Sequence, residues 1–221
     1  MKIDIVTLFP KMFSGPFDES IIKRATSKGL VEINIHDLRN WGQDKRKTVD
    51  DRPYGGGVGM ILRVDVIDTA ISNLKTLNSK VILLDATGEK FTQQKARDLS
   101  KEKHLILISG HYEGVDARVQ EHLADEVISI GDFVLTGGEI PAMVVVDTVV
   151  RLIPGVLEKP AATEFESFSE GTLEYPQYTR PENYHGWKVP KVLLSGDHKE
   201  IESWRKKAAL KRTKKVRPEL V

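Results

Sequence analysis

Glycines cluster with charged and aromatic residues in three short runs of this 221-residue chain. Glycine inside a fold costs conformational entropy, so such clusters mark tight turns or close approaches of the backbone to a ligand. In the first run Asp50, Arg52 and Tyr54 supply a carboxylate, a guanidinium and a ring, a set that can recognise a purine. Three such runs in one small chain predict a folded small-molecule site. The runs are residues 50–60 (DDRPYGGGVGM), 110–116 (GHYEGVD) and 129–139 (SIGDFVLTGGE).

The runs do not match the common nucleotide-binding fingerprints. The chain has no GxxxxGK[ST] sequence, and GxGxxG fails in the first run because its last position is Met60. It also has no GxSxG nucleophile elbow and no cysteine, which excludes thiol nucleophiles, disulfides and thiolate-bound metals. The six histidines show no HExxH or close paired spacing, so we predict no metal held by the protein.

Composition predicts a soluble protein with one medium-sized domain, or one domain with a small appendage. Hydrophobic residues make up 40% of the chain, enough for a sizeable core. The N-terminus has no long apolar stretch typical of a secretory signal, and no window approaches the length of a membrane span. Together with the lack of cysteine, this favours a reducing cytoplasm.

Strand-like and helical patterns alternate along the first two-thirds of the chain, which predicts an α/β fold with a mainly parallel sheet and helices on both faces. In such sheets ligands bind at the carboxyl ends of the strands. Residues 85–88, 109–114 and 130–138 each follow a strand-like run and are therefore expected at one edge. Strands are predicted over residues 3–8, 31–35, 81–84 and 105–109, and helices over residues 12–28, 64–75, 92–101 and 139–152.

The last predicted helix of this region is apolar almost all round between residues 143 and 152, so we expect it to be buried against the sheet, a second subunit, or both. Composition changes after Ile153, and five of the ten prolines lie between Pro154 and Pro190. This predicts a domain over residues 1–157, an irregular linker over 158–175 and a helical domain over 176–221.

The end of the chain is strongly basic. Between Lys199 and Arg217 there are nine Lys and Arg residues and two acidic residues. Such a run is either the solvated face of a terminal helix or a surface that attracts the phosphates of a polyanion such as RNA. The charge alone leaves both interpretations open.

Taken together, these runs resemble the bacterial tRNA (guanine-N1)-methyltransferases, the TrmD family of the SPOUT class. The resemblance covers nearly the whole chain, and several of the matching runs are long. They are residues 5–10 (IVTLFP), 48–60, 110–116, 129–143, 151–157, 178–181 (YTRP) and 217–220 (RPEL).

The resemblance implies S-adenosylmethionine as the methyl donor and guanosine 37 of tRNA as the acceptor. It also implies a deep trefoil knot in the cofactor domain, a tRNA-binding C-terminal domain, and a homodimer with the active site at the subunit interface. The cofactor-binding residues it implies are Leu83, Leu84, Gly110, Tyr112, Glu113, Ile130, Gly131, Asp132, Phe133, Val134, Leu135, Gly137 and Gly138.

Guanine chemistry sets what the catalytic residues must do. N1 of guanine carries a proton at neutral pH, so a carboxylate must remove it while a cation stabilises the charge that grows on O6. By resemblance, Glu166 is the base and Arg151 is the cation. The family has aspartate where Glu166 stands, and tyrosine is usual where Phe133 stands. The substrate-binding residues implied are Asp50, Arg52, Tyr54, Gly55, Gly56 and Phe168.

Other functions stay open at this point. A SPOUT enzyme acting on another RNA, an RNA-binding protein that keeps the fold without activity, and a general nucleotide-binding module would each account for part of the pattern.

Overall fold

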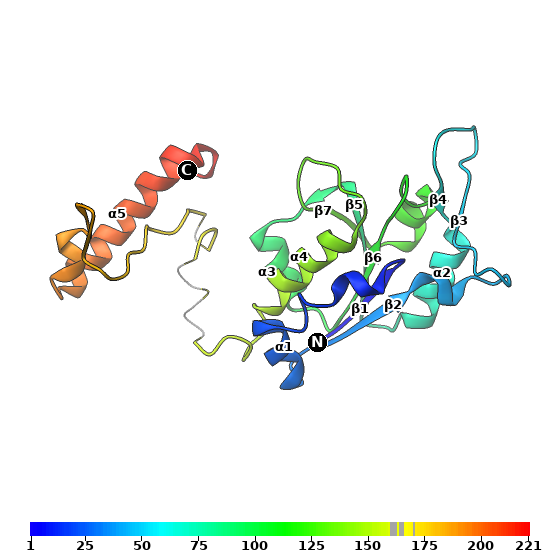
Figure 1. Ribbon diagram of the computed structural model, residues 1–221, viewed down its shortest axis with the longest axis horizontal. Helices are drawn as coiled ribbons and strands as arrows, with labels where there is room; N and C mark the ends of the chain where they lie inside the picture. The colour runs from blue at the N-terminus through cyan, green and yellow to red at the C-terminus, as the bar shows by residue number, and fades with distance from the viewer. Residues whose placement is uncertain (160–162, 164–165, 170) are drawn as a thin grey trace. The chain divides into compact units, whose positions relative to one another are not determined.

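A five-stranded sheet organises the first part of the chain in the computed structural model (Figure 1). Its strands are all parallel and lie in the order β2-β1-β6-β5-β7. The structure describes residues 1–159, 163, 166–169 and 171–221, which divide into a first unit, Met1–Glu158, and a second unit, Lys159–Val221. The sheet lies in the first unit and comprises β1 (Lys2–Thr7), β2 (Glu32–Asp37), β5 (Ser79–Lys90), β6 (His104–Ser109) and β7 (Glu126–Ser129).

Helices cover both faces of this sheet because successive apolar side chains along its strands point to opposite faces. In β6, Leu105 and Leu107 pack into one core, and Ile106 and Ile108 pack into the other. The first core is closed by α1, α3 and α4, and the second by α2 and the short helical segment Val119–Leu123. The helices are α1 (Ser20–Ser27), α2 (Val64–Leu74), α3 (Gln93–Leu99) and α4 (Glu139–Val150).

This arrangement confirms the predicted α/β fold with a parallel sheet covered on both faces. The helix predicted over residues 12–28 is wrong in its first half, where a short 3-10 helix, Pro10–Phe13, is followed by a turn. Gly15 has a φ of +96°, and the Asp18 carboxylate accepts a hydrogen bond from its N–H at 3.0 Å. Pro16 also disfavours helical backbone at the preceding residue, so α1 begins only after this break.

Strand β5 is longer than the predicted strand over residues 81–84. Its pairing with β7 shifts register between Leu84 and Glu89, so the residues between them leave the ladder. At Gly88 the backbone passes so close to β7 that a Cβ there would lie 2.6 Å from the carbonyl carbon of Val127. An interruption of this kind bends the strand locally.

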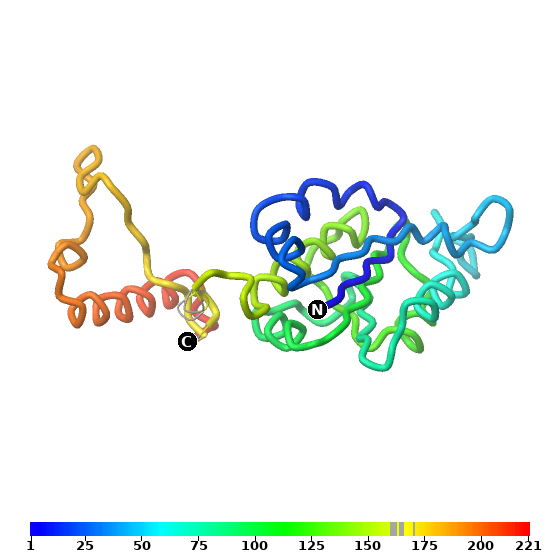
Figure 2. Tube along the Cα trace, turned by 90° about the horizontal axis from the view of Figure 1, so that it is seen from below, coloured from blue at the N-terminus to red at the C-terminus, as the bar shows by residue number. Residues whose placement is uncertain are grey.

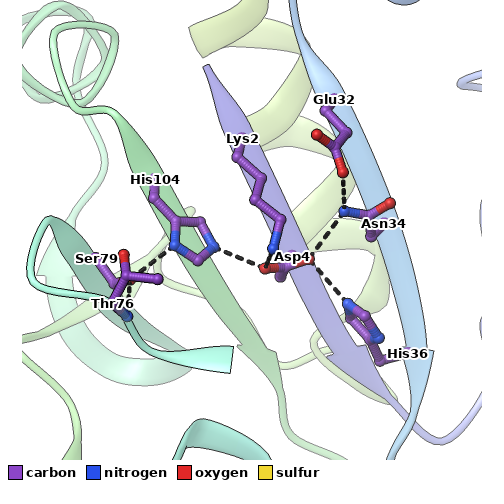
Figure 3. Close-up of polar contacts among 8 residues, drawn as sticks. All are labelled: Lys2, Asp4, Glu32, Asn34, His36, Thr76, Ser79 and His104. Atoms are coloured by element: carbon purple, nitrogen blue, oxygen red, sulfur yellow. Dashed lines mark hydrogen bonds and ion pairs between the residues drawn. The ribbon is translucent and has the colours of Figure 1, made fainter. Parts of the chain in front are cut away.

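A buried carboxylate, Asp4, joins three neighbouring strands at the opposite, amino end of the sheet (Figure 3). His36 of β2 and His104 of β6 each donate a hydrogen bond from Nε2 to this carboxylate, at 2.9 and 2.7 Å. Lys2 Nζ lies 2.8 Å from Oδ2, and Asn34 donates to Oδ1 at 3.1 Å. Burial alone would raise the pKa of Asp4, but these hydrogen bonds outweigh it and lower the pKa from 3.8 to about 2.

Acid should therefore destabilise the first unit through Asp4. Because the folded-state pKa is depressed, the stabilisation is fully present above the unfolded-state pKa near 4 and is lost as the pH falls toward 2. The loss is on the order of 2 kcal/mol. Urea unfolding between about pH 2 and pH 7 should show a weaker acid dependence in Asp4→Asn than in the wild-type chain.

The matched control is Asp68→Asn, which changes an exposed carboxylate on α2. It should keep the full acid dependence. If Asp4→Asn and the wild-type chain have the same urea midpoint of unfolding at every pH in this range, Asp4 does not contribute to the acid dependence.

The second unit is built around a long helix, α5 (His198–Val216). The Asp197 carboxylate caps it by accepting hydrogen bonds from the N–H groups of Lys199 and Glu200. The preceding chain lies along α5, where the Leu173 N–H donates to Thr213 Oγ1 at 2.9 Å. A small antiparallel hairpin, β8 (Asn183–Tyr184) and β9 (Trp187–Lys188), completes the unit.

The linker and domain boundaries proposed within residues 158–221 stay a prediction. In the described part of the chain, no helix combines the length and apolar character needed to cross a membrane.

Candidate functional site

A cavity of about 250 Å³ opens beside the interruption in β5 and at the carboxyl ends of β6 and β7, the two strands that flank β5 in the sheet. This edge is where ligands bind in parallel α/β sheets. Its walls come from the loops that follow these strands and from the first turn of α4. The lining residues are Leu84, Asp85, Ala86, residues 110–114, 128–131 and 133–138, and Pro141.

Backbone hydrogen bonds join the three glycine runs around this cavity. The Gly138 N–H donates to the Gly110 carbonyl at 2.7 Å, which ties the third run to the second. The Glu113 N–H donates to the Met60 carbonyl at 3.1 Å, and the Leu62 N–H donates to the Gly114 carbonyl at 3.0 Å. These bonds tie the second run to the first, so the runs singled out in the sequence form one continuous structure.

Two glycines of the third run are required by the geometry. Gly131 has a φ of +156°, and a side chain there would collide with the ring of Phe133. At Gly138 a Cβ would lie 2.7 Å from Ser109 Cα and 2.8 Å from the Gly110 N atom. Real Cβ atoms do not approach backbone so closely, so Gly138 lets the start of α4 pack directly onto the end of β6.

Polar side chains lie behind the cavity wall. Glu139, only 1% exposed, accepts a hydrogen bond from Thr7 Oγ1 at 2.8 Å, and its other carboxylate oxygen lies 3.6 Å from His111 Nδ1. The Phe9 ring packs on the His111 ring with 4.6 Å between centroids. Among the described residues, His111 Nδ1 and Ser109 Oγ are buried with no hydrogen-bond partner. Unsatisfied buried polar atoms at a cavity are expected where a ligand or water completes the bonding.

Sequence reasoning missed this group. In the sequence, His111 is only one of six histidines without metal-ligand spacing, whereas in the structure it lines the cavity. Its place directly after Gly110, at the end of a buried strand, was the available signal. The burial of Glu139 had no comparable signal, because a carboxylate in the first turn of a helix is usually exposed.

Most of the predicted cofactor residues line the cavity, and two do not. Leu83 is buried in the core under α2, because side chains alternate along β5 and its neighbour Leu84 takes the cavity side. Asp132 is exposed, with its carboxylate 3.6 Å from Lys90 Nζ. The eleven that line the cavity are Leu84, Gly110, Tyr112, Glu113, Ile130, Gly131, Phe133, Val134, Leu135, Gly137 and Gly138.

Of the substrate residues predicted in the first run, Asp50 lies in β3 (Asp50–Asp51). Arg52, Tyr54, Gly55 and Gly56 lie on the loop that joins β3 to β4 (Ile61–Leu62), which rises from the sheet in Figure 1. Tyr54 is fully exposed there. Arg52 and Tyr54 also line a second hollow, whose far wall is formed by Asp116 and Arg118. Hydrogen bonds from the Arg118 side chain hold the pKa of Asp116 below its ordinary value. The loop therefore presents its polar side chains beside the segment that also lines the cavity.

Comparison with known proteins distinguishes a tRNA methyltransferase from the other RNA-modifying, RNA-binding and nucleotide-binding functions left open by the sequence. The family described as tRNA (Guanine-1)-methyltransferase TrmD matches residues 1–221. The chain belongs to this family. A relative from Dictyoglomus turgidum is 58% identical over 221 residues, covering 100% of this chain and 90% of the relative. Relatives from Geobacter sp. (strain M21) and Geobacillus kaustophilus are each 54% identical over 223 residues, covering 100% of this chain and 90% and 91% of the relatives. All three relatives are named tRNA (guanine-N(1)-)-methyltransferase.

The two catalytic residues implied by likeness to the TrmD family do not line the cavity. Arg151 caps the carboxyl end of α4, whereas the cavity lies at the amino end of that helix. Twelve residues of helix separate the two ends by roughly 18 Å. Glu166 belongs to the second unit, where it lines a hollow against α5 together with His198 and Arg205.

Phe168, the remaining residue predicted for this TrmD-type site, is also in the second unit. Its ring is half exposed, and the guanidinium of Arg217 lies 5.7 Å from the ring centroid. Phe168 has a φ of +71°, and its N–H donates to the Thr172 carbonyl at 2.8 Å. The Ser169 N–H donates to the Glu166 carbonyl at 3.1 Å, so Glu166 and Phe168 lie in one turn.

Proposed function

We propose that this chain transfers a methyl group from S-adenosylmethionine to N1 of guanosine 37 in tRNA. The observation that carries the proposal is the match to the tRNA (guanine-1)-methyltransferase family over residues 1–221. Relatives more than half identical over the whole chain are named for methylation of guanine N1 in tRNA. The cavity, lined by the second and third glycine runs, supplies a site for the donor.

The cavity has the chemistry that S-adenosylmethionine needs. Phe133, Val134 and Leu135 offer apolar surface for a base, and the glycines leave backbone groups open for hydrogen bonds. The side chain of Glu113 on the wall and the buried Glu139 behind it favour a cationic ligand. His111 lines the cavity, and its Nδ1 is buried without a hydrogen-bond partner among the described residues. We assign cofactor binding to these walls, and we keep Leu83 and Asp132 in the proposal on likeness to the family alone.

Bound S-adenosylmethionine supplies a methyl group carried on a positively charged sulfur. The protein supplies position, a base and a cation. Glu166 accepts the N1 proton of guanine as the bond from N1 to the methyl carbon forms and the bond from sulfur to that carbon breaks. Arg151 stabilises the negative charge that develops on O6. Asp50, Arg52, Tyr54, Gly55, Gly56 and Phe168 hold the target nucleotide outside the base stack of the anticodon loop.

The site as proposed needs two copies of the chain, with Arg151 and Glu166 reaching each cavity from opposite subunits. The length of α4 supports this, because Arg151 is too far along the helix to reach the cavity at its own amino end. On α4, Ile140 and Val144 are 46% and 38% exposed on one face, which offers apolar surface for a partner helix. By likeness to the family, the cofactor domain contains a deep trefoil knot, and the basic C-terminal domain binds tRNA in the cytoplasm.

Mass spectrometry of nuclease digests tests this proposal directly. Unmodified tRNA transcripts with guanosine 37 are incubated with the protein and an isotopically labelled donor. We expect one labelled methyl group per transcript, in 1-methylguanosine at position 37. A transcript with adenosine at position 37 is the matched control and should stay unlabelled. Label at another guanosine, label only in ribosomal RNA, or binding of donor and tRNA without transfer would each overturn the proposal.

A further inference from the structure

Three aromatic rings gather on the β8–β9 hairpin of the second unit. Tyr184 and Trp187 are 55% and 74% exposed, and the ring of His185 lies between them in sequence. The Tyr184 centroid is 4.2 Å from that of His185 and 6.0 Å from that of Trp187. Figure 2 shows the hairpin standing away from α5. Large exposed aromatic groups mark a binding surface.

The turn holds these rings in a defined arrangement. His185 and Gly186 have φ of +52° and +89°, the combination of a two-residue hairpin turn with both central residues left-handed. Tyr184 and Trp187 are directly paired across the strands, and the Gly186 N–H donates to Asn183 Oδ1 at 3.0 Å. Because the turn already orders these rings, they should lose little conformational entropy when a ligand binds.

The surrounding charge favours a polyanion as the occupant. Residues 183–217 contain eleven Lys and Arg residues and three acidic residues. A positive surface that follows a phosphate backbone, combined with exposed rings that stack on bases, is the usual arrangement for binding unpaired nucleotides. Unpaired bases of folded RNA are commonly held by stacking on aromatic side chains.

We propose that Trp187 and Tyr184 form a stacking platform for an unpaired base of the RNA substrate, outside the methylation site. This inference rests on the proposed function for the identity of the RNA. The proposed ligand is a nucleobase because aromatic rings stack on bases. Contacts with phosphates alone would need only the Lys and Arg side chains. A second copy of the chain is the rival occupant.

Tryptophan fluorescence tests the contact without any need for catalysis. The chain has three tryptophans, so Trp41→Phe with Trp204→Phe leaves Trp187 as the only one. Stacking on a base should quench the emission of this variant when an unmodified tRNA transcript is added. Unchanged emission at saturating tRNA would overturn the proposal, whether or not the protein methylates the transcript.

Steady-state kinetics give a second, independent readout in the otherwise wild-type chain. Trp187→Ala should raise KM for tRNA by roughly 10-fold with kcat unchanged, the range for losing one base stack. Trp187→Phe, which keeps an aromatic face, should stay within about threefold of wild type. The slope of log KM against log salt should not change in Trp187→Ala, because stacking releases no counterions.

The matched control is Val216→Ala, which removes a comparably exposed apolar side chain from the same unit and should leave KM unchanged. An unchanged KM in Trp187→Ala would refute the platform. So would a shift to a smaller species in sedimentation velocity for that variant, since this would assign the hairpin to contact between copies. If wild-type protein binds tRNA with quenching but transfers no methyl group, the proposed function fails and the platform stands.

Discussion

Replacing Glu166 with alanine should lower kcat for tRNA methylation by about 100- to 10,000-fold, the range expected when a general base is removed. The reason is that N1 of guanine becomes a nucleophile only when its proton leaves. The dissociation constant for S-adenosylmethionine, measured by calorimetry, should stay within about twofold of wild type, because the proposed contact of Glu166 is with guanine and not with the donor. Single-turnover transfer of a labelled methyl group would measure the chemical step itself.

Two further variants sharpen this test. Glu166→Asp keeps a carboxylate on a shorter side chain and restores the residue usual in the family, so it should retain most of the activity. Glu174→Ala removes another carboxylate from the same hollow and should leave kcat near wild type. Full activity in Glu166→Ala, or an equal loss in Glu174→Ala, would refute the assignment of the base.

Gly138→Ala should abolish cofactor binding and destabilise the first unit by about 1–3 kcal/mol, the cost of overpacking a rigid interior. Gly138 has a φ of −82°, which any residue adopts, so backbone strain plays no part. The cost comes from the new methyl group meeting Ser109 Cα at 2.7 Å. To relieve this contact, α4 must move away from the end of β6 and open the cavity wall. Calorimetric melting and donor titration would measure both effects.

Gly110→Ala is the control for this substitution. Gly110 lines the same cavity, but a Cβ there would meet Val115 Cγ1 at an ordinary 3.5 Å. Its melting temperature should therefore stay close to that of wild type. If Gly138→Ala melts like Gly110→Ala and binds the donor, the close packing of α4 on β6 does not shape the site.

The strands and the position of the cavity were predictable from sequence because short-range patterns determine them. Buried parallel strands appear as apolar runs, and the second and third glycine runs each follow one of them, so their meeting at one edge followed from topology. Gly15 and Pro16 indicate the short break before α1. The prediction of one helix over residues 12–28 followed the apolar spacing instead and missed this break. Periodicity is a good guide to a helix face and a poor guide to where a helix begins.

Contacts between residues distant in sequence were not predictable in this way. Asp4 and Glu139 are both buried, although carboxylates are rarely buried without partners. Their partners lie as far away in sequence as His104 and Thr7, and no local pattern indicates those pairs. The β8–β9 hairpin escaped prediction because strands of two residues show no alternation. Catalytic roles for Arg151 and Glu166 came from family resemblance alone.

The buried carboxylate of β1 also limits how the sheet can misassemble. A slip of one residue between neighbouring strands would turn apolar side chains outward and is excluded by hydrophobicity. A slip of two residues would leave Ile3 and Ile5 on the same face of the sheet as before, so hydrophobicity alone would not exclude it. It would, however, carry Asp4 away from Asn34 and His104 and strand an unpaired charge in the interior, at a cost of several kcal/mol. One acidic side chain thus helps to fix the register of three strands as the chain folds.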